Sequence, residues 1–112
     1  MQKELFEKLN KANTLNEIQD YLGKVIEIRG FSDQPVEQRM LLLIEEVGEL
    51  AKAIRKEKTT MGVDSSNSVD SIESEIADIF IVLVSVCNNL DINIFEALKE
   101  KEFKNINRTW TK

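Results

Sequence analysis

The stretch from residue 38 to residue 56 has apolar residues three and four positions apart, the spacing that favours an amphipathic helix. On a helix that turns by about 100° per residue, one apolar face lies within roughly 60° of Val47. Its members are Met40, Leu43, Ile44, Leu50, Ala51 and Ile54. We therefore predict a helix here, with this face in the core.

Three carboxylates interrupt the same helix. Glu46 and Glu49 share a ridge with Leu42 one turn earlier and Ala53 one turn later, and Glu45 lies beside Glu49. An unpaired buried carboxylate costs several kcal/mol of stability. Acids between apolar neighbours therefore need a cation, a hydrogen-bond donor or a cleft.

Local signals predict two shorter helices before the central one. Residues 2–11 can form a short amphipathic helix, and Thr14 with Glu17 has the spacing of a capping box that begins the next helix. Gly30 is a suitable stop for that helix. Pro35 suits the first turn of the central helix, which we expect to end near Lys58.

Two more helices are predicted after the central one. Residues 59–70 are polar and read as a loop, with Asp70 as a cap for a helix over residues 71–90. This helix is apolar nearly all round, which indicates burial on several sides, as a central helix or at a subunit interface. Asn93 and Glu96 should cap a last helix that runs to about residue 108.

The helix over residues 71–90 also carries a pair of acids, Glu75 and Asp78, one turn apart on one face. If it packs antiparallel to the central helix, this pair can face Glu46 and Glu49. Four carboxylates at one place repel one another unless a hard cation lies among them, and oxygen-only ligation suits Mg²⁺ or Mn²⁺. We therefore predict a metal site formed by Glu46, Glu49, Glu75 and Asp78.

The alternative for these acids is a solvated stripe that pairs with lysines or with a neighbouring subunit. Glu45 lies on the edge nearer Lys52 and Lys56, so for this residue a surface ion pair and a role near the metal both stay open.

Composition narrows the classes of function. A chain of 112 residues predicts a single domain over residues 1–112, and its net charge of −5 argues against binding to a nucleic acid polymer. The absence of histidine excludes Ser-His-Asp and Cys-His catalysis. One cysteine, no evident signal peptide and no apolar run long enough for a membrane span fit a cytoplasmic protein.

The acidic motifs EEVGE (residues 45–49) and ESEIAD (residues 73–78) resemble the EExxE and ExxD signature of the MazG-like all-α nucleotide pyrophosphohydrolases. The resemblance extends from about residue 15 to residue 108. It implies a helical bundle completed by oligomerisation and Mg²⁺-dependent cleavage of nucleoside triphosphates to monophosphate and pyrophosphate. It also implies metal ligands at Glu46, Glu49, Glu75 and Asp78, with Glu45 in the same motif.

Lys101, Asn105 and Arg108 are expected on one ridge of the last helix. The family often has a similar basic–Asn–basic pattern that contacts phosphate and nucleotide, so the resemblance implies substrate binding by these residues. A solvated charged face is the alternative. Trp110 could stack on a base or pack against protein.

Together these observations predict an all-α, four- to five-helix bundle-like domain that forms a homodimer or homotetramer and hydrolyses nucleoside triphosphates with Mg²⁺. Glu45, Glu46 and Glu49 are the candidates for the general base that activates water. Two other functions stay open: a non-catalytic acidic interaction module, and a pyrophosphohydrolase for a related compound such as phosphoribosyl-ATP.

Overall fold

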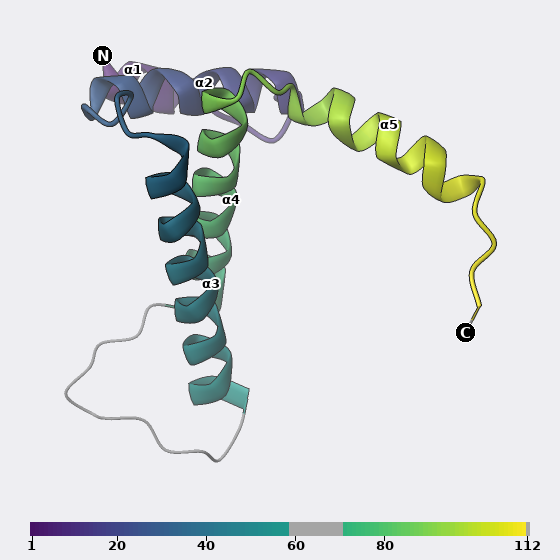
Figure 1. Cartoon of the computed structure of the whole chain (residues 1–112). Coiled ribbons are helices and arrows are strands. Elements are labelled where there is room, and N and C mark those ends of the chain that lie inside the picture. The colour runs from purple at the N-terminus through teal and green to yellow at the C-terminus, as the bar shows by residue number, and fades with distance from the viewer. Residues whose placement is uncertain (59–70, 112) are drawn as a thin grey trace. The chain divides into compact units, whose positions relative to one another are not determined.

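The computed structural model describes residues 1–58 and 71–111, which form five α-helices and no strand (Figure 1). The helices are α1 (Gln2–Glu7), α2 (Leu15–Ile28), α3 (Val36–Lys58), α4 (Ile72–Asn89) and α5 (Ile94–Ile106). The predicted all-α class is confirmed. The predicted loop over residues 59–70 and the cap at Asp70 lie outside the described residues.

The helix ends follow the local signals in the sequence. At the start of α2, the Thr14 hydroxyl accepts from the Glu17 N–H at 3.1 Å, and the Glu17 carboxylate accepts from the Thr14 N–H at 2.7 Å. Gly30, just after α2, has a φ of 83°, in the left-handed region that glycine adopts most easily. The Asn93 side chain accepts from the Glu96 N–H at 2.9 Å and begins α5. The capping box, the glycine stop and the last cap are confirmed.

The chain divides into two compact units, which we call the terminal unit and the central unit. The terminal unit comprises Met1–Asp33 and Cys87–Lys112, and the central unit comprises Gln34–Val86. Helix α4 begins in the central unit, and its last residues belong to the terminal unit. The single domain expected over residues 1–112 stays a prediction.

In the terminal unit, α2 contacts both α1 and α5. The side-chain amide of Gln19, which is buried, donates to the Asn88 side chain at 2.9 Å and to the Ile92 carbonyl at 2.8 Å. Its oxygen accepts from the Ile94 N–H at 3.0 Å. One glutamine thus fixes α2 to the end of α4, to the connection after it and to the start of α5, and the buried Leu22 and Val25 supply apolar packing beside it.

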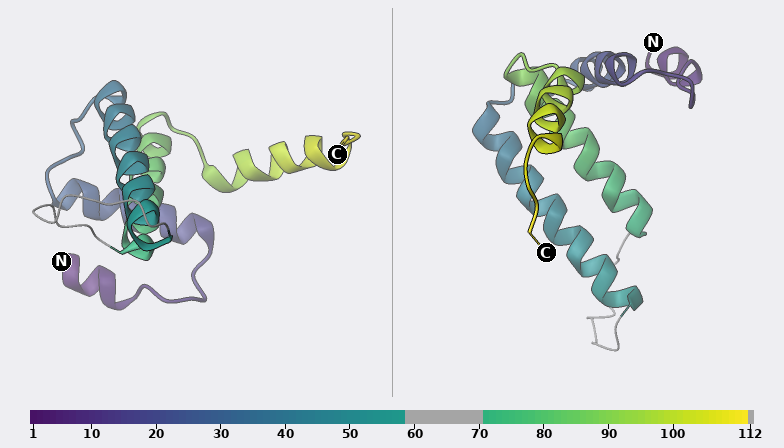
Figure 2. Two further views of the ribbon diagram at one scale, coloured as in Figure 1. Left: turned by 90° about the horizontal axis from the view of Figure 1, so that it is seen from below. Right: turned by 90° about the vertical axis from the view of Figure 1, so that its right-hand side faces the viewer.

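In the central unit, α3 and α4 lie side by side and run antiparallel, as Figures 1 and 2 show. Arg39 of α3 is only 4% exposed, and its Nη1 donates to both the carbonyl and the hydroxyl of Ser85, each at 2.9 Å. Val84 of α4 and Ala53 of α3 are fully buried. The predicted antiparallel packing of the two acidic helices is therefore confirmed.

The predicted core face of α3 is wrong within this chain. Val47, at the centre of that face, is 50% exposed, and Ile44 is 64% exposed. The buried residues of α3 are Arg39 and Ala53, on the neighbouring ridge that also carries Glu46. Apolar spacing identified a helix with apolar residues on two adjacent ridges, but it could not decide which ridge α4 covers.

Within the single chain, helix α4 is buried only in part, and its expected burial at a subunit interface stays a prediction. Val84, Ser85 and Val86 are buried near its C-terminal end, whereas Ile76 is 53% exposed and Leu83 is 39% exposed. Packing within the chain therefore leaves part of the apolar surface of α4 open. Among the described helices, no single one is long and apolar enough to cross a membrane. Helices α4 and α5, taken together as a bent pair, would be long and apolar enough by length and composition alone.

Candidate metal centre

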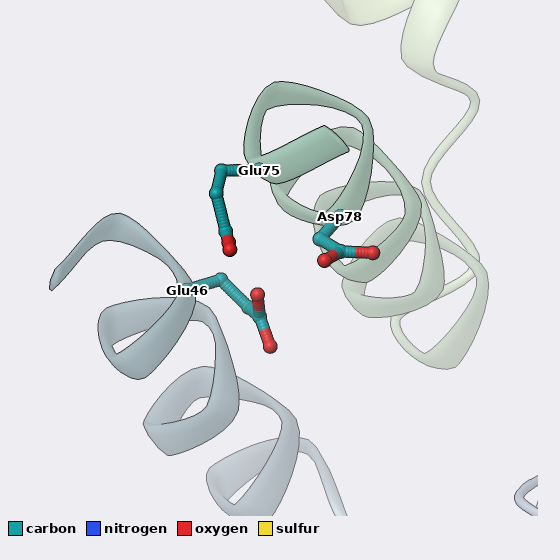
Figure 3. Close-up of side chains that lie close together, drawn as sticks. All are labelled: Glu46, Glu75 and Asp78. Atoms are coloured by element: carbon teal, nitrogen blue, oxygen red, sulfur yellow. The ribbon is translucent and has the colours of Figure 1, made fainter. Parts of the chain in front are cut away.

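Three carboxylates of the central unit come together between α3 and α4 (Figure 3). Glu46 comes from the middle of α3, and Glu75 and Asp78 come from the beginning of α4. One oxygen atom of each carboxylate lies within 4.8 Å of the other two. Glu75 is 3% exposed, and Glu46 and Asp78 are half-buried. We call these residues the carboxylate triad.

Helix periodicity explains why these residues meet. Glu75 and Asp78 are one turn apart and therefore lie on one face of α4. Glu46 is seven residues after Arg39 and seven before Ala53, and seven residues are about two helical turns, so all three share the ridge of α3 that packs on α4. The start of α4 is fixed by the Ser71 hydroxyl, which accepts from the Ser74 N–H at 3.1 Å.

The donor set of the triad suits a small divalent cation. Carboxylate oxygens are the ligands that Mg²⁺ and Mn²⁺ prefer, and the chain has no histidine to favour a softer metal. One oxygen atom of each acid lies within 4.8 Å of the other two, so small side-chain rotations would let all three acids hold one ion. A cation also offsets the repulsion between adjacent carboxylates, one of which is buried.

The structure does not bring Glu49 or Glu45 into the triad. Both side chains are exposed on α3, although they flank Glu46 in the same motif. Glu46 and Glu49 differ by about 60° around the helix axis, so Glu46 points toward α4 while Glu49 stays at the edge of the ridge. The predicted roles of Glu49 as a metal ligand and of Glu45 and Glu49 as candidates for the base stay predictions.

The predicted substrate-binding residues belong to the terminal unit. Lys101 is exposed on α5, and Asn105 is half-buried in the last turn of that helix. Helix α5 ends at Ile106, so Arg108 lies in the turn after the helix. The expectation of one helical ridge with all three residues is therefore wrong for Arg108, because the helix ends two residues earlier. Their role in substrate binding stays a prediction.

Arg39 is the residue near this site that the sequence analysis missed. Besides its two hydrogen bonds to Ser85, its Nε donates to the Gln34 carbonyl at 3.1 Å. Its spacing of seven residues from Glu46 was the available signal, because this spacing places both residues on one helix face. The burial of Arg39 and its hydrogen bonds to Ser85 show that the ridge of Glu46 is the one that packs on α4.

A comparison with known protein families shows to which family this chain is related. The family described as the MazG nucleotide pyrophosphohydrolase domain matches residues 34–110, which is more than half of the 112-residue chain. The chain belongs to the MazG family. The matched region of this MazG-family chain includes α3, α4 and α5, and with them the carboxylate triad.

Two comparisons with one relative agree with this assignment. The uncharacterised protein YpjD of Bacillus subtilis (strain 168) is 38% identical over 58 residues, which are 52% of this chain and 52% of YpjD. The matched segment thus spans about half the length of that curated relative. The crystal structure of the candidate pyrophosphatase YpjD from Bacillus subtilis superposes on this chain with a TM-score of 0.70. The two chains are 28% identical, and the superposition covers 85% of this chain and 97% of that chain. The MazG-family chain and YpjD therefore have similar folds.

Proposed function

We propose that this MazG-family protein is a Mg²⁺-dependent nucleoside triphosphate pyrophosphohydrolase that releases a nucleoside monophosphate and pyrophosphate. The carboxylate triad is the observation that carries the proposal. Its three acids come from two helices, and their carboxylate oxygens, the type of donor that Mg²⁺ prefers, lie within 4.8 Å of one another. The family assignment supports the type of reaction.

Glu46, Glu75 and Asp78 would hold the Mg²⁺ ion, and Mn²⁺ would suit the same oxygen donors. When bound, the ion supplies positive charge that offsets the charge of the triphosphate during phosphoryl transfer. The buried position of Glu75 and the half-buried positions of the other two acids limit the access of water to the ligand oxygens.

The general base is best sought among the acids outside the triad. Glu45 and Glu49 are exposed on the same helix as Glu46, so water can reach their carboxylates. In the proposed reaction, one of these carboxylates takes a proton from the attacking water, and the water oxygen bonds to phosphorus. The bond from this phosphorus to the bridging oxygen breaks, which separates the nucleoside monophosphate from pyrophosphate. Glu46, the third candidate from the sequence, is less suitable because it is in the triad.

Lys101, Asn105 and Arg108 are the proposed substrate-binding residues. The two cationic side chains are exposed and can donate to phosphate oxygens, and the half-buried Asn105 amide can donate or accept. This assignment rests on the basic–Asn–basic pattern in a region that the MazG family covers.

The protein is further proposed to be a homodimer or homotetramer. Large apolar side chains of α3 are exposed along one face, including Met40, Ile44, Val47 and Ile54. Soluble proteins rarely leave such a stripe open to water. A second copy of the chain is the occupant that we propose for this face.

Binding and turnover measurements test the proposal. Titration calorimetry with Mg²⁺ and a nonhydrolysable triphosphate should show that each strengthens the binding of the other, and pyrophosphate release should follow for at least one nucleotide in a panel of triphosphates. Bound Mg²⁺ should also raise the melting temperature, by a stabilisation of about 2.7 kcal/mol at a hundred times its dissociation constant.

Glu75→Gln and Asp78→Asn should abolish both the turnover and the effect of Mg²⁺ on melting. Glu73→Gln is the matched control, because Glu73 is exposed in the same first turn of α4 and lies outside the triad. A protein that binds Mg²⁺ but no triphosphate would instead be an acidic interaction module. Pyrophosphate release from phosphoribosyl-ATP alone would reassign the substrate.

A further inference from the structure

The residues after α5 form a compact turn around one carbonyl group. The Asn105 carbonyl accepts two hydrogen bonds, from the Arg108 N–H and from the Trp110 Nε1–H, each at 3.2 Å. The chain thus folds back after Ile106 and returns the indole ring to the end of the helix. In this position the Arg108 guanidinium lies over the Trp110 ring, 4.4 Å from its centroid.

This contact orders two side chains at the surface. Trp110 is 61% exposed and Arg108 is exposed, so the contact does not come from packing in a core. A guanidinium that lies on an aromatic face is held by the ring quadrupole and still has its N–H groups at the edges for bidentate contact with phosphate. The ring therefore restricts the orientation of Arg108 without using its hydrogen-bond donors.

The neighbouring Asn105 side chain is held in the same turn. Its Nδ2 donates to the Glu102 carboxylate at 3.1 Å, and its Oδ1 is buried and accepts no hydrogen bond from the described residues. The indole N–H of Trp110 is hydrogen-bonded to the backbone carbonyl of Asn105. Two of the three proposed substrate-binding residues are thus ordered by one tryptophan.

We propose that Trp110 is a positioning residue, which holds Arg108 and the end of α5 in the arrangement that binds the polyphosphate of the substrate. The inference rests on the proposed function, because it assumes that Arg108 contacts phosphate. Loss of the ring would free Arg108 to sample other rotamers. Polyphosphate binding would then weaken to a similar extent in the ground state and in the transition state. KM should then rise while kcat stays nearly constant.

Kinetics of three variants test the positioning role. Trp110→Ala should raise KM about two- to five-fold, the range expected for loss of an exposed cation–π contact, with kcat within about two-fold of wild type. Trp110→Phe should restore most of the affinity, because it keeps an aromatic face for the guanidinium. Phe103→Ala, which removes an exposed aromatic side chain from the same helix, is the control and should leave KM unchanged.

Intrinsic fluorescence gives a readout that needs no turnover, because Trp110 is the only tryptophan of the chain. Inorganic tripolyphosphate with Mg²⁺ should change the emission of the wild-type protein in a saturable manner, and Arg108→Gln should weaken this response. Wild-type turnover with unchanged KM for Trp110→Ala would overturn the positioning role and leave the proposed function intact. No turnover of any nucleotide, with an Arg108-dependent response to tripolyphosphate, would overturn the proposed function and support the positioning role. No response to tripolyphosphate would overturn the positioning role.

Discussion

Arg39 illustrates how single residues decide the packing of the central unit. Its guanidinium is buried, and it donates to backbone and side-chain oxygens of Ser85 on α4 and to the Gln34 carbonyl before α3. Hydrogen bonds that involve a charged group contribute more to stability than neutral ones, provided that the buried group is satisfied. Arg39 therefore fixes α3 against α4 two turns from Glu46, and indirectly it fixes the triad.

Replacement of Arg39 should destabilise the protein. Arg39→Met keeps much of the side-chain volume but removes the donors to Ser85, and we expect the free energy of unfolding to fall by about 1.5–3 kcal/mol. Urea denaturation followed by circular dichroism measures this loss. Lys56→Met, at an exposed position of the same helix, is the control and should change stability by less than about 0.5 kcal/mol. Equal stability of the two variants would contradict the packing role of Arg39.

At the scale of an element, the start of helix α2 depends on the side chains of two residues. The capping box joins Thr14 and Glu17 by two hydrogen bonds at the first turn. The hydrogen bond from the Thr14 backbone, with a smaller contribution from its hydroxyl, lowers the pKa of Glu17 below its ordinary value of 4.5. The ionised form of Glu17 is thus favoured in the folded helix.

A pH dependence follows from this lowered pKa. Because the folded state favours the ionised carboxylate, the contribution of Glu17 to stability is fully present above the ordinary pKa of 4.5 and is lost as pH falls through the lowered pKa of the folded state. Melting temperatures of the wild type and Glu17→Gln should therefore differ at neutral pH and converge in acid. A constant difference across this range would contradict the role of the ionised cap.

Substitution by alanine should have opposite effects on stability at two glycines. Gly30 has a φ of 83°, and an added Cβ would meet nothing within 4 Å, so Gly30→Ala should cost about 1–2 kcal/mol through backbone strain alone. Gly48 lies inside α3 with equally open space around it, so Gly48→Ala should stabilise the helix by about 0.5–1 kcal/mol. Denaturant titrations of both variants test the pair. A loss of stability for Gly48→Ala would indicate that another chain approaches this glycine closely.

At the scale of the whole molecule, the amount of exposed apolar surface is the main feature. Beyond the stripe on α3, Ile76 and Leu83 of α4 and Ile106 of α5 are all more than a third exposed. A chain of 112 residues has a small core, and association is a common way to bury additional apolar area. The faces that the single chain leaves open are thus candidates for contact between copies.

Light scattering at low micromolar concentration should therefore give the mass of a dimer or tetramer. Ile44→Glu places a charge in the middle of the exposed stripe of α3 and should shift the mass toward the monomer, because an unpaired charge is costly at an apolar interface. Lys56→Glu, at an exposed position of the same helix, should leave the mass unchanged if it lies outside the interface. A wild-type monomer with full activity would contradict the proposed assembly.

The sequence by itself determined the local features of this protein. Helix starts and stops at Thr14, Gly30 and Asn93 depend on side chains within one turn of the helix end, so they could be predicted without a partner. The same applies to the pairing of Glu75 with Asp78 on one face of α4. The acidic motifs also carried the resemblance that the family match confirms.

Only the tertiary structure decided which faces meet. Helix α3 has apolar residues over a wide arc, and its own periodicity favours the ridge of Val47, which the single chain leaves half exposed. The packing of α4 selected the ridge of Glu46, which buried Arg39, brought Glu46 to Glu75 and left Glu49 exposed. Such a choice depends on contacts between residues far apart in the sequence, and a rotation of about 60° around one helix is enough to change which acid joins the site.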